Sequence, residues 1–145
     1  MDYPLITILA VNYNHSDFIA LMLYGLQKLT HNPYKVIICD NGSVNKHVLD
    51  LVKTARKYDN VELVFRQQGE NEWGSISHGI ALDILIGLSN SEYTVVMDGD
   101  CTVLAKDWDQ KISVTLRESI PQSCHNPVLA STDNSGLMEI GRAHV

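Results

Sequence analysis

Long apolar runs are missing from this 145-residue sequence. No stretch approaches the length of about 18 residues that a helix needs to cross a bilayer. The first residues also lack the basic, apolar pattern of a secretion signal. We therefore expect no membrane segment in this chain, although attachment to a membrane through parts outside it stays open.

Cysteine is scarce, and its three positions form no Cys-x-x-Cys pair. Neither a disulfide framework nor a cysteine zinc site is therefore predicted. Cys39 lies within an apolar run, which is typical of a buried, reduced thiol. Because reduced thiols persist in the cytoplasm, we expect a cytoplasmic protein.

Positive charge is also in short supply. The chain has 11 Lys and Arg against 17 Asp and Glu, which gives a formal net charge of −6. This balance argues against nucleic acid as a partner. It also means that binding a diphosphate would require a compensating charge, which a divalent cation can supply.

Apolar runs rich in β-branched residues alternate along the chain with segments of helical spacing. We expect strands at residues 5–11, 35–39, 61–65 and 93–97, and helices at residues 16–29, 48–55, 75–88 and 108–116. Ser16 or Asp17 is expected to cap the first helix. This order predicts an α/β fold, a Rossmann-like and mostly parallel sheet with helices on both faces.

The last seven residues, 139–145, resemble one reading frame of a common sequencing adapter. We interpret them as a non-native tail and exclude them from fold reasoning. Residues 1–138 are then expected to form one domain that is incomplete at its C-terminus.

The acidic triplet Asp98-Gly99-Asp100 directly follows the last predicted strand. Ligands of open α/β sheets bind at the carboxyl ends of the strands. Two carboxylates at that edge suit Mn²⁺ or Mg²⁺, and such ions commonly hold phosphate oxygens. The pattern therefore favours a metal-assisted diphosphate site, with a solvated acidic turn as the alternative.

Polar residues also follow the first two strands, at residues 12–14 and 40–43. Tyr13 can pack on a nucleobase, and Asp40 can accept hydrogen bonds from a base or a ribose. Gly42 permits a tight turn with close backbone approach. Alternatively, Asn14 and Ser43 cap the helices that follow them.

Four motifs in this order resemble the nucleotide-binding half of family 2 glycosyltransferases, which have the GT-A fold. The motifs are Val11-Asn12-Tyr13-Asn14, Asp40-Asn41-Gly42-Ser43, Trp73-Gly74-Ser75 with residues 77–83, and Asp98-Gly99-Asp100. The resemblance covers roughly residues 4–118.

The resemblance implies a site for a nucleotide-diphospho-sugar donor. The implied nucleotide-binding residues are Val11, Asn12, Tyr13, Asn14, Asp40, Gly42, Ser43, His78 and Asp98. Asp98 and Asp100 would bind the metal, Mn²⁺ or Mg²⁺, which stabilises the leaving nucleoside diphosphate. By the same resemblance, the transfer would invert the anomeric centre.

The sequence departs from the family pattern in ways that limit these expectations. Asn45 stands where the family often has an Asp, and His78 stands near the usual position of a basic residue. The family's catalytic base lies in its C-terminal half, and no residue here is identified as that base. We therefore expect this chain to carry the donor site only; its acceptor, whether glycan, lipid or other, is not predicted.

Other functions compete with this interpretation. One is a nucleotide-binding fragment without turnover. Another is a haloacid-dehalogenase-type phosphatase, since residues 98–102 also fit its Asp-x-Asp-x-Thr motif, with Asp98 as nucleophile and Asp100 as acid/base. That family usually places this strand early in the domain, whereas three strand–helix units precede it here. A nucleotidyltransferase would show a basic, glycine-rich stretch where residues 12–15 stand.

Overall fold

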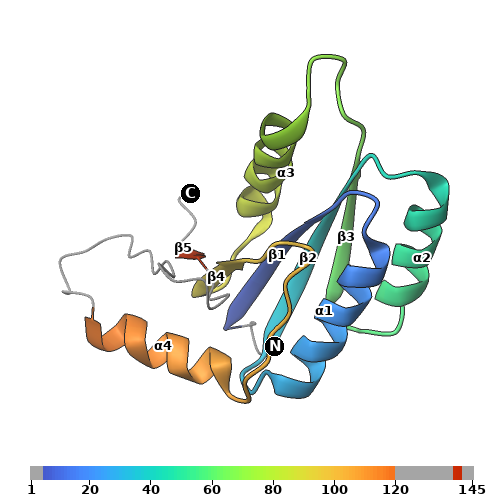
Figure 1. Cartoon of the computed structure of the whole chain (residues 1–145). Helices are drawn as coiled ribbons and strands as arrows, with labels where there is room; N and C mark the ends of the chain where they lie inside the picture. The colour runs from blue at the N-terminus through green and yellow to red at the C-terminus, as the bar shows by residue number, and fades with distance from the viewer. Residues whose placement is uncertain (1–4, 120–138, 142–145) are drawn as a thin grey trace.

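The computed structural model describes residues 5–119 and 139–141 (Figure 1). The strands are β1 (Ile6–Asn12), β2 (Tyr34–Asn41), β3 (Val61–Arg66), β4 (Tyr93–Val96) and β5 (Glu139–Gly141). The helices are α1 (Ser16–Leu29), α2 (Asn45–Ala55), α3 (Gly74–Leu88) and α4 (Trp108–Ser119). The strands form one sheet in the order β3-β2-β1-β4-β5.

The sheet is parallel except at its β5 edge. β1 pairs with β2 and β4 in parallel, β2 pairs with β3 in parallel, and β5 pairs with β4 antiparallel. The predicted α/β fold with a mostly parallel, Rossmann-like sheet is confirmed. The interpretation of residues 139–145 as a non-native tail stays a prediction, and Cys124 lies outside the described residues.

β1 is the centre of the molecule, with all seven of its residues buried. Burial on both faces explains why its sequence is a continuous apolar run rather than an alternating one. Ile6 lies opposite Tyr34 on one side and opposite Tyr93 on the other. This register brings the carboxyl ends of β1, β2 and β4 to the same edge of the sheet.

Helices cover both faces of the sheet (Figure 1). Ile8 and Ala10 of β1 belong to a core cluster with residues of α1, α2 and α4. Leu9 and Val11, which alternate with them, belong to a second cluster with Ala81 and Leu85 of α3. Cys39 is a free, buried thiol on the α3 side, as expected.

One local expectation fails in detail, and the buried face of one helix is not the one that its isoleucines mark. Ser16 is the first residue of α1, not its cap; the cap position is His15, which makes no side-chain capping bond. The Ser16 hydroxyl instead lies 2.8 Å from Nδ1 of His47. In α3 the isoleucines at four-residue spacing remain exposed, whereas Ser77, Ala81 and Leu85 are buried.

None of the helices within the described ranges combines the length and the apolar character needed to cross a bilayer.

Candidate functional site

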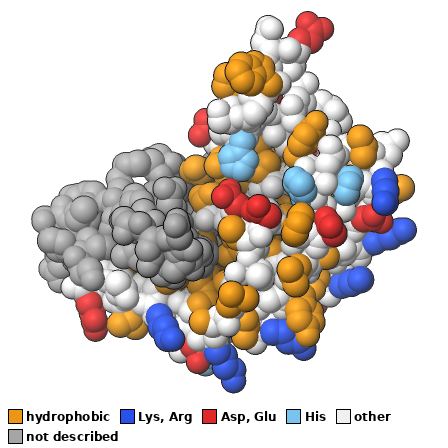
Figure 2. Space-filling view, in the orientation of Figure 1, with side chains coloured by type: hydrophobic (Ala, Val, Ile, Leu, Met, Phe, Trp, Pro, Cys, Tyr) orange, Lys and Arg blue, Asp and Glu red, His pale blue; other side chains and the backbone are white. Residues whose placement is uncertain are grey.

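A cleft of about 560 Å³ lies at the carboxyl edge of the sheet. It is lined by Val11, Tyr13, His15, Asn41, Gln68, Trp73, Gly74, Ser77, His78, Asp98, Gly99 and Asp100. Figure 2 shows acidic and histidine side chains gathered on this face, with Lys and Arg mostly toward its margins. Ends of three parallel strands therefore meet in one concave surface, the usual ligand position of such sheets.

The acidic turn after β4 presents its carboxylates to solvent. Asp98 and Asp100 are exposed, and the Cys101 amide donates to the Asp98 carbonyl at 2.9 Å to close the turn. Ligand atoms of Asp98, Asp100 and Cys101 lie within 4.8 Å of one another. Burial and then the neighbouring carboxylates raise the pKa of the Cys101 thiol, which keeps it protonated at neutral pH. The two carboxylates are therefore the groups suited to a hard divalent cation.

His78 approaches this turn from the first half of α3. Its Nε2 lies 4.0 Å from an Asp98 carboxylate oxygen, and its side chain is 42% exposed. The imidazole can thus donate a hydrogen bond into the cleft beside the acidic turn. The contact of His78 with a donor diphosphate stays a prediction.

A hydrogen-bonded clasp joins the turns after β1 and β2. The Asn12 amide donates to the Asp40 carboxylate at 2.9 Å, and the Ser43 backbone N–H donates to its other oxygen at 3.1 Å. The Ser43 hydroxyl accepts from the backbone N–H of Asn14 at 2.8 Å. The Asn14 side chain in turn accepts from the Val44 N–H at 2.8 Å. This clasp is buried around Asp40 and Asn12 and holds the two turns together behind the cleft.

The clasp depends on two residues with left-handed backbone. Gly42 has φ of +84° and Asn14 has φ of 57°. Glycine adopts this region without steric cost, and asparagine is among the few other residues that do so readily.

The structure separates the predicted nucleotide-binding residues into two groups. It brings Val11, Tyr13, His78 and Asp98 to the cleft, together with the predicted metal ligand Asp100. It does not place Asn12, Asn14, Asp40, Gly42 or Ser43 in the cleft lining, since they form the clasp. The alternative that Asn14 and Ser43 cap helices is wrong, because the cap positions are His15 and Val44. Nucleotide contact by the clasp residues stays a prediction.

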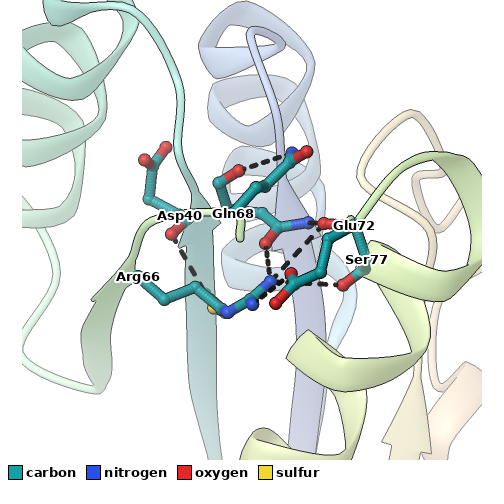
Figure 3. Close-up of polar contacts among 7 residues, drawn as sticks. Asp40, Arg66, Gln68, Glu72 and Ser77 are labelled. Atoms are coloured by element: carbon teal, nitrogen blue, oxygen red, sulfur yellow. Dashed lines mark hydrogen bonds and ion pairs between the residues drawn. The ribbon is translucent and has the colours of Figure 1, made fainter. Parts of the chain in front are cut away.

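The connection between β3 and α3 and the start of α3 supply cleft residues that the sequence analysis did not name as nucleotide-binding, among them Gln68, Trp73 and Ser77. Figure 3 shows the polar network that fixes this connection. Arg66 donates to the Asn41 side chain and pairs with the Glu72 carboxylate. Asn41 donates to the Ser77 hydroxyl at 2.9 Å, and Gln68 donates to the Asn41 carbonyl at 2.8 Å.

The Arg66–Glu72 contact is stable at neutral pH. The hydrogen bond from Arg66 is the main cause that lowers the Glu72 pKa. A lowered pKa means that the contact stabilises the fold above the ordinary carboxyl range and is lost as pH falls through the lowered pKa. The loop over residues 67–73 is mostly polar. This contact therefore ties Glu72, near the end of the loop, to Arg66 at the end of β3.

Gly99 allows the acidic turn to approach β1 closely. A Cβ at this position would lie 2.9 Å from the Val11 carbonyl oxygen and 3.3 Å from Cδ1 of Ile19. We expect Gly99→Ala to displace the turn, weaken metal-dependent ligand binding and lower the free energy of unfolding by about 1–3 kcal/mol. Urea unfolding and calorimetric titration with Mn²⁺ and a nucleoside diphosphate check this.

Gly87→Ala provides the matched control. Gly87 lies in α3 outside the cleft lining, and a Cβ there meets nothing within 4 Å. The change should leave binding intact and raise stability by about 0.5–1 kcal/mol through helix propensity. Equal behaviour of the two variants would contradict the steric role given to Gly99.

The model of the family described as glycosyl transferase family 2 matches residues 7–117. The chain belongs to this family. The matched range includes the residues that line the cleft. We found no match among curated proteins.

Solved structures support the fold of this family 2 chain. The mannosyltransferase PcManGT from Pyrobaculum calidifontis, in complex with GDP-Man and Mn²⁺, is 19% identical with a TM-score of 0.57, covering 74% of this chain and 30% of that one. Residues 1–349 of TarS from S. aureus are 19% identical with a TM-score of 0.61, covering 85% of this chain and 34% of that one. The family 2 chain thus spans about a third of the length of these two structures. Both similarities show the GT-A glycosyltransferase fold.

Proposed function

We propose that the cleft binds a nucleoside-diphosphate sugar with a divalent cation, and that the protein transfers the sugar to an acceptor. The observation that carries this proposal is the pair Asp98 and Asp100, which leaves β4 inside a cleft also lined by Tyr13 and His78. A sugar nucleotide needs the three features of this arrangement: a cation site, a polar donor beside it and an aromatic surface. Membership of family 2 supports the transferase class.

The residues present fit a hard divalent cation. Asp98 and Asp100 would hold it, because their exposed carboxylates lie close enough to share one ion. When bound, Mn²⁺ or Mg²⁺ would act as a Lewis acid toward the diphosphate that leaves. The Mn²⁺ and GDP-Man of the PcManGT complex support both the metal and the donor class. The net charge of −6 and the two carboxylates of the acidic turn favour a cation beside an anionic ligand.

The side chains of the cleft divide the work of holding the donor. Tyr13 is 49% exposed and offers its ring face to a nucleobase. His78 is placed to donate a hydrogen bond to a phosphate oxygen next to the acidic turn. The clasp around Asp40 fixes the turn that carries Tyr13. These roles orient the donor, and none of them is the role of a catalytic base. On the family resemblance, we propose that the transfer inverts the anomeric centre.

A nucleotide-binding protein without transfer is the second candidate, because the features assigned to the cleft within residues 5–119 all belong to the donor side. Metal-dependent nucleotide binding with no sugar transfer to any acceptor would support it. Family membership disfavours the phosphatase interpretation, in which Asp98 would form a covalent bond to phosphate.

Calorimetric titration tests the proposal directly. UDP, GDP and dTDP are titrated into the purified chain with Mn²⁺, with Mg²⁺ and with EDTA. We expect binding of one nucleotide only when the cation is present, which would also identify the base. A folded chain that binds none of the three, with either cation, would contradict the donor-site assignment.

A further inference from the structure

Trp73 is unusually exposed for a residue of a ligand cleft. The side chain lines the cleft, yet 73% of its surface is open to solvent. An indole is the largest apolar side chain, so leaving it in water forgoes the burial that would stabilise the fold. A ligand ring that covers the indole in the bound state would recover part of that burial.

The indole is carried on a segment that is fixed on both sides. Before it, Glu72 pairs with Arg66, and the Glu72 N–H donates to the Gly69 carbonyl at 3.1 Å. After it, Ser77 is held by Asn41 through a bond of 2.9 Å. Trp73 therefore stands on an ordered support, which lowers the entropy that stacking a ligand ring would cost.

The strand order indicates which part of a donor would reach Trp73. The acidic turn follows β4, and the loop that carries Trp73 follows β3, at the other end of the parallel strand order β3-β2-β1-β4. Figure 1 shows that this loop projects beyond the carboxyl edge of the sheet. A donor with its diphosphate at the acidic turn would extend its nucleoside across β1 and β2 toward that loop, with the exposed ring of Tyr13 beside the base as well.

We propose that Trp73 stacks on the nucleobase of the donor and thereby selects ligands that carry a base over ligands that do not. This inference rests on the proposed function, since it needs a nucleoside diphosphate in the cleft. Stacking on an aromatic side chain is tolerant of base identity but requires a planar ring. Ligands with a base should therefore engage Trp73, and ligands without one should not.

Intrinsic fluorescence can isolate this residue. The chain has two tryptophans, and the other, Trp108, is buried with its indole N–H donating to Thr30 at 3.1 Å. The difference in emission between the wild-type chain and Trp73→Phe therefore reports Trp73. The substitution leaves the core unaltered, because Trp73 is exposed. We expect a nucleoside diphosphate with Mn²⁺ to quench this difference signal and shift it to shorter wavelength. Pyrophosphate and hexose 1-phosphate with Mn²⁺, which carry no base, should leave it unchanged.

Calorimetry supplies the independent readout. Trp73→Ala should raise the Kd for the nucleoside diphosphate about tenfold, with Trp73→Phe closer to wild type and pyrophosphate affinity unaffected. Leu104→Ala is the matched control, since Leu104 is 89% exposed and does not line the cleft.

The outcomes separate this inference from the proposed function. Nucleotide binding that requires Asp100, with unchanged Trp73 emission and an unchanged Kd for Trp73→Ala, overturns the role of Trp73 and leaves the donor site standing. If hexose 1-phosphate quenches the emission and the nucleoside diphosphate does not, the sugar lies on the indole and the nucleobase assignment is overturned. Failure of every nucleotide to bind the folded chain overturns both.

Discussion

Asp100→Asn is expected to abolish metal-dependent nucleotide binding, with a rise in Kd of more than about 100-fold. Changing a residue that merely supports a metal ligand commonly costs about 10- to 100-fold in affinity, so losing a ligand carboxylate should cost more. The amide keeps the size of the side chain but removes the charge that holds a hard cation. Because the Asp100 side chain is exposed, the fold should be unaffected. Calorimetry with Mn²⁺ and the preferred nucleotide measures the loss.

Asp83→Asn is the control for this experiment. Asp83 is also an exposed aspartate, on α3 and outside the cleft lining. Its variant removes the same charge and should bind as the wild type does, with equal thermal unfolding midpoints for all three chains. If Asp100→Asn still binds the nucleotide with undiminished Mn²⁺ dependence, the acidic turn is not the cation site.

Asp40→Asn should cause the largest loss of stability, about 3 kcal/mol in the free energy of unfolding. Each Asp40 oxygen accepts one hydrogen bond, from the Asn12 amide or the Ser43 backbone. An asparagine presents one oxygen and one NH₂ group, so a donor would face a donor inside a site that is 2% exposed. A buried donor left without an acceptor costs far more than an exposed one. Urea unfolding monitored by circular dichroism measures the change.

Asp59→Asn, at an exposed position, should unfold like the wild-type chain. Nucleotide titration of Asp40→Asn under native conditions adds a second readout. Loss of affinity beyond that explained by unfolding would support the predicted contact between Asp40 and the base. A stability equal to that of wild type would refute the clasp as a structural element.

The four parallel strands were predictable because each of them contains a short apolar run, whereas β5 was not predicted. β1 and β4 are buried beside each other, and strands buried on both faces give continuous apolar runs. The exposed stripe of Ile76, Ile80 and Ile84 predicted α3 correctly but does not mark its buried face. Periodicity shows that a helix is present, whereas the face that packs is decided by which residues fit the sheet.

The candidate site was only partly predictable for a related reason. Asp98 and Asp100 could be identified because acidic residues directly after a buried strand are chemically distinctive. Trp73 belongs to a motif that resembles the family, but neither it nor Gln68 could be assigned to the cleft. Their place there depends on how Arg66 pairs with Glu72 and folds back the loop between β3 and α3. That contact is a tertiary interaction within a polar segment that has no periodic pattern. An arginine at a strand end with a glutamate six residues later was the available signal.

The placement of β1 between β2 and β4 has a consequence for the order of folding. The pairing of Ile6 with Tyr34 closes a short stretch of chain, whereas its pairing with Tyr93 closes a much longer one. Longer closures cost more entropy and form more slowly, so the β-α-β unit of β1, α1 and β2 is expected to form before β4 inserts. The acidic turn reaches the cleft only with that last step. Metal and nucleotide would therefore bind and stabilise only the fully folded chain. Ligand binding would then follow folding and would not direct its early steps.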